Sequence, residues 1–160
     1  DAKGVKPVEL AYQKLSHHVI VISEDKKTVS SSEAHVRVAT SPLFADRPKR
    51  AEERLHNLLY ELGRGNWDVS TTLVWDEFVE MHELFHTSKP GFTYFNKDVQ
   101  KTLDFLKDMR KSKKDSPLVT MDAGPNIHLL FNEDQKKLEK SLLSDLKRGA
   151  KIISSVDFHV

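Results

Sequence analysis

The sequence predicts an α+β domain in which helices are layered on one mainly antiparallel sheet. Three observations predict it. Short β-branched runs occur near both ends of the chain, three consecutive segments between them repeat apolar residues at helical spacing, and the connections are tight turns rather than linkers. The chain has 160 residues, and a soluble chain of this size buries roughly 70% of its unfolded surface, which suffices for one core. We therefore expect residues 1–160 to form a single domain.

The first elements are predicted to be a hairpin followed by a helix. The run His18-Val-Ile-Val-Ile22 is β-branched and predicts a buried strand. Residues Thr28–Ser31 are expected to return as the second strand of the hairpin. Ser30-Ser31-Ser32-Glu33 then places serines ahead of an acidic side chain, which is typical of a helix start.

The next segment predicts a helix after a break that Pro42 and Pro48 bracket. Its leucines recur at i, i+3, i+4 and i+7, which places them on one face. Gly63 and Gly65 are expected to end the helix. The predicted inward leucines are Leu55, Leu58, Leu59 and Leu62.

Two further helices complete the middle of the chain. One starts near Asp68 and ends at Ser88-Lys-Pro-Gly91, because proline cannot continue a helix. The other starts with Asn96 as its N-cap. The predicted inward faces are Val74, Phe78, Met81 and Phe85 in the first of these helices, and Val99, Leu103, Leu106 and Met109 or Arg110 in the second.

The last quarter of the sequence returns to strands. Leu118–Met121 and Ile127–Phe131 predict two strands joined by the tight connection Asp122-Ala-Gly-Pro125. Asn132 is expected to cap a helix, and Ile152-Ile153 begins a final strand. The predicted inward residues of that helix are Leu138, Leu142 and Leu146, with Gly149 as its stop.

Composition excludes several classes of function. The chain has no cysteine, so disulfides, thiolate metal sites and cysteine nucleophiles are excluded. Basic and acidic residues number 25 and 24, and this balance argues against a dedicated nucleic-acid binder. The apolar runs are only a few residues long, too short to span a membrane. We expect a cytoplasmic protein.

One motif suggests a metal site. His82-Glu83-Leu84-Phe85-His86 is an HExxH sequence on a predicted helix, where two histidines at i and i+4 share a face and can hold zinc. No convincing third ligand follows, and His86 lies close to Pro90. A zinc hydrolase using His82 and His86 is therefore an alternative, and a pair of ordinary helix histidines is the favoured interpretation.

Two other segments can carry chemistry. In Met121-Asp-Ala-Gly-Pro-Asn126, Asp122 leaves a buried strand and Gly124 allows a substrate or another backbone to approach closely. The alternative is a plain hairpin turn in which Asp122 and Asn126 cap backbone amides. In Val29-Ser-Ser-Ser32, hydroxyls and free N–H groups at a helix start can bind an anion. The alternative there is simple capping.

Taken together, these segments resemble the C-terminal half of diphosphomevalonate decarboxylases, in the GHMP kinase superfamily. The resemblance runs in colinear order from about Val19 to Phe131, and the Met-Asp-Ala-Gly-Pro-Asn hexapeptide is its most specific part. The segments that carry it are Val29-Ser-Ser31, Thr40-Ser41-Pro-Leu-Phe44, Met81-His82, Pro90-Gly-Phe-Thr-Tyr94 and Thr120-Met-Asp-Ala-Gly-Pro-Asn126.

The resemblance implies a function and roles for residues. The family phosphorylates the 3-hydroxyl of mevalonate 5-diphosphate with ATP and Mg²⁺, and then eliminates phosphate and CO₂ to leave isopentenyl diphosphate. Its catalytic aspartate falls on Asp122. Its serine pair falls on Ser30 and Ser31, of which Ser31 is the expected ligand of the substrate diphosphate. Gly124 and Asn126 are expected to shape the floor of the same pocket.

The sequence also departs from the family. Ser32-Glu-Ala-His35 replaces the residues that commonly follow the serine pair, so a related GHMP kinase acting on another phosphorylated alcohol is an alternative. The family's phosphate-binding Pro-x-Ser-x-Gly-Leu-Ser-Ser motif is not among the 160 residues. We therefore expect an N-terminal ATP-binding domain as partner, and no activity from these residues alone. The family tends to dimerise, which makes a homodimer a further expectation, and a non-catalytic binding module is the last alternative.

Overall fold

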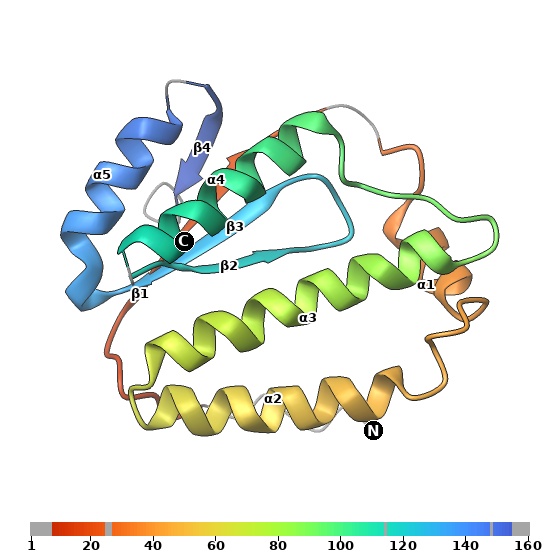
Figure 1. Ribbon diagram of the computed structural model, residues 1–160, viewed down its shortest axis with the longest axis horizontal. Helices are drawn as coiled ribbons and strands as arrows, with labels where there is room; N and C mark the ends of the chain where they lie inside the picture. Colours follow the sequence, from red (N-terminus) through yellow and green to blue (C-terminus); the bar gives the residue numbers. More distant parts are fainter. Residues whose placement is uncertain (1–7, 25–26, 114, 148, 155–160) are drawn as a thin grey trace.

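The structure is a computed structural model, and it describes residues 8–24, 27–113, 115–147 and 149–154 (Figure 1). One strand is followed by four helices, and a strand pair, a helix and a last strand complete the described chain. In chain order they are β1 (Leu15–Val21), α1 (Ser31–Val38), α2 (Arg47–Gly63), α3 (Trp67–Thr87), α4 (Lys97–Lys113), β2 (Leu118–Met121), β3 (Ile127–Asn132), the 3₁₀ turn η1 (Glu133–Gln135), α5 (Lys136–Leu146) and β4 (Lys151–Ser154).

The described strands form one four-stranded antiparallel sheet in the order β2-β3-β1-β4. The β2–β3 hairpin pairs Met121 with Ile127, which leaves the turn between them at one end of the sheet. β1 inserts beside β3, with Ile20 opposite Ile127. The predicted α+β fold with a mainly antiparallel sheet is confirmed.

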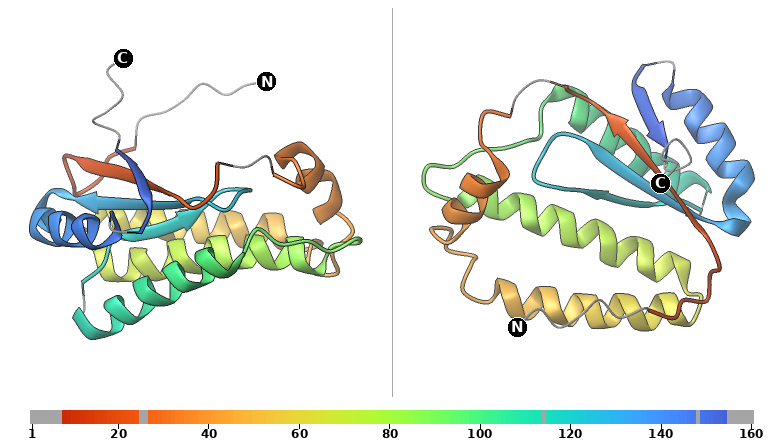
Figure 2. Two further views of the ribbon diagram at one scale, coloured as in Figure 1. Left: turned by 90° about the horizontal axis from the view of Figure 1, so that it is seen from above. Right: turned by 180° about the vertical axis from the view of Figure 1, so that it is seen from behind.

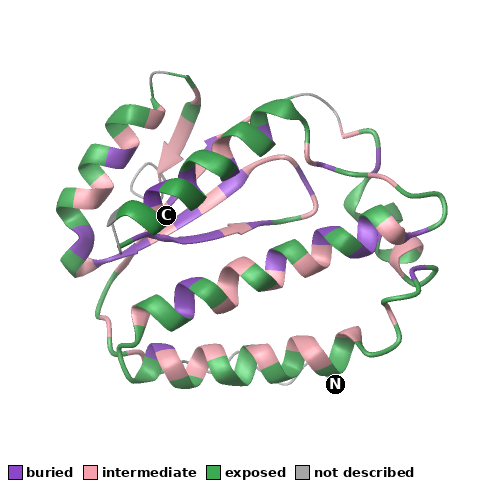
Figure 3. Cartoon of the chain, in the orientation of Figure 1, coloured by how far each residue is buried: buried purple, intermediate pink, exposed green. Residues whose placement is uncertain are grey.

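The main core lies between one face of this sheet and helices α3, α4 and α5. Figure 2 shows α3 and α4 on the same side of the strands, and Figure 3 shows buried residues along β2 and β3. The helical spacing predicted for α4 is confirmed, because Val99, Leu103, Leu106 and Met109, which lie three or four positions apart, are all buried. The buried residues of the main core are Ile20, Phe78, Val99, Leu103, Leu106, Met109, Val119, Met121, Ile127, Leu129, Phe131 and Leu142.

Helix α2 packs on α3 largely through charge. Arg47 and Arg54 both pair with Glu77, while Arg50 and Arg54 contact Glu80 at 2.6 and 2.5 Å. Burial alone would raise the pKa of Glu80, but the hydrogen bonds and positive charges of Arg54 and Arg50 outweigh it, so the pKa lies below the ordinary value. Each glutamate bridges two arginines of α2, and these contacts fix the register of α2 along α3.

Two details of α2 differ from the sequence prediction. The helix begins at Arg47, so Pro48 lies in its first turn instead of before it, a position where the missing proline N–H costs nothing. Leu55 is 52% exposed, although its spacing predicts an inward residue, and Leu62 alone of the four leucines is fully buried. The helix lies at the margin of the fold, so its apolar stripe is only partly covered.

The predicted strand at Thr28–Ser31 is wrong. The backbone of Ser30 is extended, but its hydroxyl accepts a hydrogen bond from the Glu33 N–H and α1 begins at Ser31. The carbonyl of Val29, which a strand partner would have used, accepts the hydroxyl hydrogen of Tyr94 instead. Capping and this distant contact satisfy the backbone groups that a hairpin would have paired.

A second, smaller cluster lies beside the main core, at the end of the sheet where the β2–β3 turn is found. Its buried residues are Val29, Ala34, Phe85 and Tyr94, against which Val38, Met81, Phe92 and Ala123 pack. We call this group the site cluster. It joins α1, the C-terminal part of α3 and the β2–β3 turn, which lie at the same end of the molecule in Figures 1 and 2.

None of the helices in the described part of the chain is long and apolar enough to cross a membrane.

Candidate functional site

Asp122 lies at the centre of the candidate site, directly after β2. Its carboxylate is exposed, whereas Met121 before it is 3% exposed and anchored in the main core. The Asp122 carbonyl accepts the Gly124 N–H at 2.8 Å, which closes a tight turn. A carboxylate is thus presented to solvent on a backbone that enters from a buried strand.

Three contacts from other elements hold this turn. The His82 Nε2–H, from α3, donates to the Asp122 carbonyl at 3.1 Å. The Lys27 ammonium, from the segment before α1, donates to the Ala123 carbonyl at 2.5 Å. At the far end of the turn, the Asn126 Oδ1 accepts the backbone N–H of Ile22 at 3.1 Å. The turn is therefore fixed from three directions, although it lies outside regular structure.

Gly124 leaves room for the close approach of Lys27. A β-carbon at this position would lie 2.5 Å from the Lys27 Nζ, 2.7 Å from its Cε and 3.0 Å from an Asp122 carboxylate oxygen. The first two distances are shorter than real β-carbons show, so a side chain here requires the flexible end of Lys27 to move away. The glycine of the predicted hexapeptide therefore makes room for an ammonium beside the carboxylate.

The two serines predicted as an anion site have different roles in the structure. The Ser30 hydroxyl is used as the N-cap of α1, at 3.1 Å from the Glu33 nitrogen. Ser31 is the first residue of the helix and is exposed. Ser32 follows in the same turn, and Glu33 forms an ion pair with Arg37 one turn later. Of the pair, Ser31 is the one whose side chain is not used by this cap.

The segments that carry the family resemblance meet in space. Tyr94 donates its hydroxyl hydrogen to the Val29 carbonyl at 2.8 Å, which joins the segment before α1 to the loop after α3. The Thr40 Oγ1 accepts the Lys89 N–H at 2.7 Å, which joins the loop after α1 to that same loop. The Lys27 ammonium lies 5.8 Å from the centre of the Tyr94 ring. Segments up to 96 residues apart thus form one site.

The two histidines of the HExxH sequence lie in different surroundings. His82 is 5% exposed, and its Nε2 is used by the Asp122 carbonyl, whereas His86 is exposed. Within the described ranges, no group of three or more histidine, aspartate or glutamate side chains could hold a metal ion. Since structural and catalytic zinc sites use three or four protein ligands, this arrangement gives no support to a zinc hydrolase.

Burial and charge shift two pKa values in the site. Burial lowers the pKa of His82 from 6.5 to about 4, although the Asp122 carbonyl and carboxylate act in the opposite direction. The pKa of Tyr94 is raised by burial first, and then by the negative charges of Asp122 and Glu33. Both side chains are therefore neutral at pH 7, and both act as hydrogen-bond donors to backbone carbonyls.

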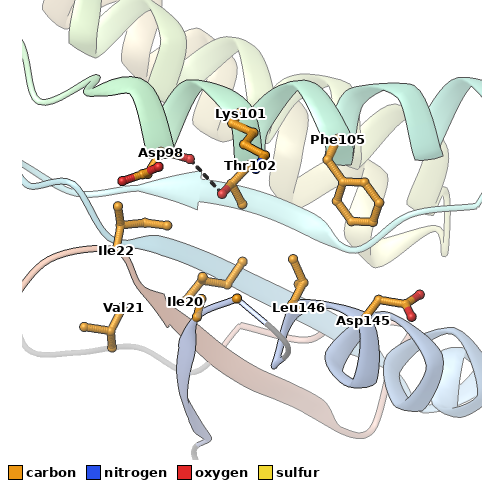
Figure 4. A pocket seen from close by; sticks show the side chains of 11 residues that line it. Ile20, Val21, Ile22, Asp98, Lys101, Thr102, Phe105, Asp145 and Leu146 are labelled. Carbon is orange, nitrogen blue, oxygen red and sulfur yellow. Dashed lines mark hydrogen bonds between the residues drawn. The ribbon is translucent and has the colours of Figure 1, made fainter.

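A cavity of about 350 Å³ lies apart from this turn, between α4, the end of β1 and the α5–β4 connection. Figure 4 shows Phe105, Thr102 and Lys101 of α4 on one side and Leu146 of α5 on the other. Neither Asp122 nor the two serines line it. The candidate site is thus an exposed turn and not this cavity.

Lys27 is the site residue that the sequence did not reveal. It occurs in the polar run Ser23-Glu-Asp-Lys-Lys27, where a lysine reads as an ordinary surface residue. The one available signal is indirect, since a glycine in the hexapeptide implies that some group approaches closely. Nothing in the sequence indicates which group that is.

Fold and site together define a class of protein, the α+β C-terminal domain of GHMP kinase-like enzymes, with a carboxylate on a turn at the end of the sheet. The family model described as mevalonate 5-diphosphate decarboxylase C-terminal domain matches residues 18–157. The chain therefore belongs to that family. A comparison with curated protein sequences returned no match.

Solved structures agree with this assignment. A mevalonate diphosphate decarboxylase from Legionella pneumophila is 38% identical with a TM-score of 0.86, and the match covers 91% of this chain and 47% of that one. A mevalonate pyrophosphate decarboxylase from Streptococcus pyogenes is 26% identical with a TM-score of 0.81, covering 92% and 46%. A structure described as MDDEF in complex with MVAPP, AMPPCP and magnesium has the same fold at 23% identity, with a TM-score of 0.74, covering 86% and 43%. The chain spans about half the length of each of these proteins.

Proposed function

We propose that this chain is the C-terminal domain of an ATP-dependent decarboxylase that converts mevalonate 5-diphosphate to isopentenyl diphosphate in isoprenoid biosynthesis. One observation carries the proposal beyond family membership. Asp122 is exposed on a turn that His82 and Lys27 hold from two other elements. A carboxylate that is both exposed and fixed can orient a substrate hydroxyl and accept its proton.

Asp122 would act on the 3-hydroxyl of the substrate. Beside a fixed carboxylate, the hydroxyl oxygen attacks the γ-phosphorus of ATP, its proton passes to Asp122, and ADP leaves. The new phosphate group then leaves with the electron pair of its C–O bond. The neighbouring carboxylate leaves as CO₂, and the electron pair of the broken C–C bond becomes the π bond of isopentenyl diphosphate. Phosphoryl transfer depends mainly on positioning and charge stabilisation, and the Lys27 ammonium beside the turn would supply positive charge for it.

The substrate diphosphate would lie at the start of α1. The N-terminus of a helix favours an anion because its first N–H groups point outward and carry partial positive charge. Ser31 is exposed there, and the Ser30 hydroxyl is used by the cap. We therefore propose Ser31 as the diphosphate ligand, with Gly124 and Asn126 shaping the floor near Asp122.

ATP and Mg²⁺ would bind mainly to an N-terminal domain that these 160 residues do not contain. The support comes from the family and from the coverage, since the Legionella enzyme is about twice as long as the matched region. A structure of the same fold is described as a complex with MVAPP, AMPPCP and magnesium. A cytoplasmic location and a homodimeric state follow from the same resemblance and remain predictions.

The experiment that tests the function uses the natural full-length protein in which this chain occurs. With mevalonate 5-diphosphate and Mg-ATP it should release CO₂, ADP and phosphate in equal amounts. The purified 160-residue chain under the same conditions should release none. ATP-dependent decarboxylation by the 160 residues alone, or its absence from the full-length protein, would contradict the proposal.

A matched pair of serine variants tests the diphosphate site. Ser31→Ala should raise the KM for mevalonate 5-diphosphate about tenfold, because one hydrogen bond to a charged group is lost. Ser32→Ala removes an exposed hydroxyl one residue further along the same helix and should leave the KM within about twofold. If the two substitutions change the KM equally, Ser31 is not the diphosphate ligand.

A further inference from the structure

His82 occupies a cage of aromatic rings under the Asp122 turn. Its imidazole stacks on Phe95, with ring centres 4.6 Å apart and planes 25° from parallel. It meets Phe78, Phe85 and Tyr94 edge to face, with ring centres between 5.2 and 6.3 Å away. The side chain is 5% exposed. The surroundings of the ring are therefore apolar on every side that these contacts cover.

Only one nitrogen of this ring is hydrogen-bonded. The Nε2 lies 3.1 Å from the Asp122 carbonyl oxygen, and the Nδ1 is buried without a partner among the described residues. Because a carbonyl can only accept, the proton must be on Nε2 and the ring is the neutral Nε2–H tautomer. The lowered pKa of His82, caused mainly by burial, agrees with a neutral ring.

The choice of histidine at this position is not explained by packing. A phenylalanine would fill the same aromatic cage without burying an unsatisfied nitrogen, which costs stability. What histidine adds is a donor aimed at the backbone of the residue that carries the reactive carboxylate. The unpaired Nδ1 is the cost of that single hydrogen bond.

The hydrogen bond limits the movement of Asp122. The same carbonyl also accepts the Gly124 N–H at 2.8 Å, so two donors fix the peptide plane that follows Asp122. The next carbonyl, of Ala123, is held by Lys27. The backbone sets the direction of the Cα–Cβ bond, so these contacts fix the base from which the exposed carboxylate extends.

We propose that His82 is a positioning residue, whose Nε2–H holds the Asp122 carbonyl and thereby aims the Asp122 carboxylate at the substrate hydroxyl. The inference rests on the function proposed above and adds to it a residue that does not touch the substrate. A displacement of about 1 Å in a reacting group can lower a rate a hundredfold. The loss of His82 should therefore appear in kcat and hardly in the KM.

The kinetic test compares four variants of the natural full-length protein. His82→Phe keeps the aromatic packing and removes the donor, and it should lower kcat about 10- to 100-fold with the KM within about threefold. In His82→Gln the amide nitrogen can take the place of Nε2, so kcat should stay within about threefold of wild type. His82→Asn carries its amide one bond too short and should resemble His82→Phe. His86→Phe changes an exposed histidine on the same helix and should change nothing.

A second measurement does not depend on turnover. Hydrogen–deuterium exchange of the backbone amides of residues 121–124 and 126 should be about tenfold faster in His82→Phe than in wild type, and near the wild-type rate in His82→Gln. If wild type releases no CO₂ but this exchange pattern is found, the proposed function fails and the positioning contact stands. If His82→Phe keeps the wild-type kcat, or if exchange is equal in all variants, the positioning role is overturned. Should His82→Phe fail to fold, His82→Gln and His82→Asn are compared instead. A kcat near wild type in the first and a lowered kcat in the second support the positioning role, and equal values overturn it.

Discussion

The main core and the site cluster are built on different principles. The main core joins regular helices to a regular sheet through apolar side chains, and its members Ile20, Ile127 and Phe131 are completely buried. The site cluster joins α1 and α3 to irregular segments, and side chains there donate to backbone carbonyls. Tyr94 donates to Val29 and His82 donates to Asp122.

The difference follows from the hydrogen-bonding needs of the backbone. In a strand or helix the chain satisfies its own N–H and C=O groups, so its side chains need only pack. In a turn or loop those groups are left over, and side chains such as Tyr94 and His82 must pair with them. A rigid functional turn therefore needs polar side chains inside an otherwise apolar cluster, and it becomes sensitive to single atoms.

The largest effect on stability is expected in the main core. Phe131→Ala should lower the free energy of unfolding by about 3–5 kcal/mol, because a completely buried ring is replaced by a cavity. Phe105→Ala, the same change at a ring that is 44% exposed, should cost far less. Urea denaturation of the purified chain measures both. Similar losses at the two positions would show that burial in the main core does not determine stability.

A smaller effect is expected on acidification, from His82, whose ring packs against Phe85 and Tyr94 of the site cluster. The pKa of His82 is 6.5 when unfolded and about 4 when folded, so the unfolded state binds more protons between these values. The contribution of the neutral His82 ring to the free energy of unfolding is therefore fully present above about pH 6.5, and it is lost as the pH falls through 4. The full loss is about 3 kcal/mol. It is measured as the difference between wild type and His82→Gln in unfolding free energy, followed from pH 7 to pH 4.

That difference isolates one residue, because carboxylates that titrate in the same range do so in both proteins. A wild type and a His82→Gln variant that lose stability in parallel would show that the His82 ring is not buried in its neutral form.

The smallest effect is expected from a single oxygen atom. Tyr94→Phe removes the hydroxyl that donates to the Val29 carbonyl, and it leaves a buried acceptor without a partner. The expected cost is about 1–3 kcal/mol of unfolding free energy. Tyr60→Phe removes a hydroxyl from a residue that is 59% exposed and should have almost no effect. The midpoints of thermal unfolding of the two variants compare them. Equal midpoints would show that the Tyr94–Val29 hydrogen bond does not stabilise the site cluster.

The same contrast explains how far the sequence could predict the fold. The buried face of α4 follows from spacing alone, with Val99, Leu103 and Leu106 all buried as predicted, and Asn96 caps the helix through the N–H groups of Asp98 and Val99. Such signals are local, since the residues that cooperate are at most a few positions apart. The main core was predictable for that reason.

The site was predictable only in part. Asp122 and Gly124 belong to one short motif and could be singled out. The contact of Lys27 with that motif spans 96 residues, and the contact of His82 spans 40, so no local pattern predicts them. The wrong strand at Thr28–Ser31 has the same origin, because the carbonyl of Val29 is satisfied by Tyr94, 65 residues away.

The central claim is that the fixed turn presents Asp122 as the reacting carboxylate, and one measurement tests it most directly. In the natural full-length protein, Asp122→Asn keeps the shape of the side chain and removes its charge and its ability to take a proton. The decarboxylation rate should fall roughly 100- to 10,000-fold, while the dissociation constant for mevalonate 5-diphosphate stays within a few-fold of wild type. Turnover that persists together with a loss of substrate binding would contradict the role of Asp122.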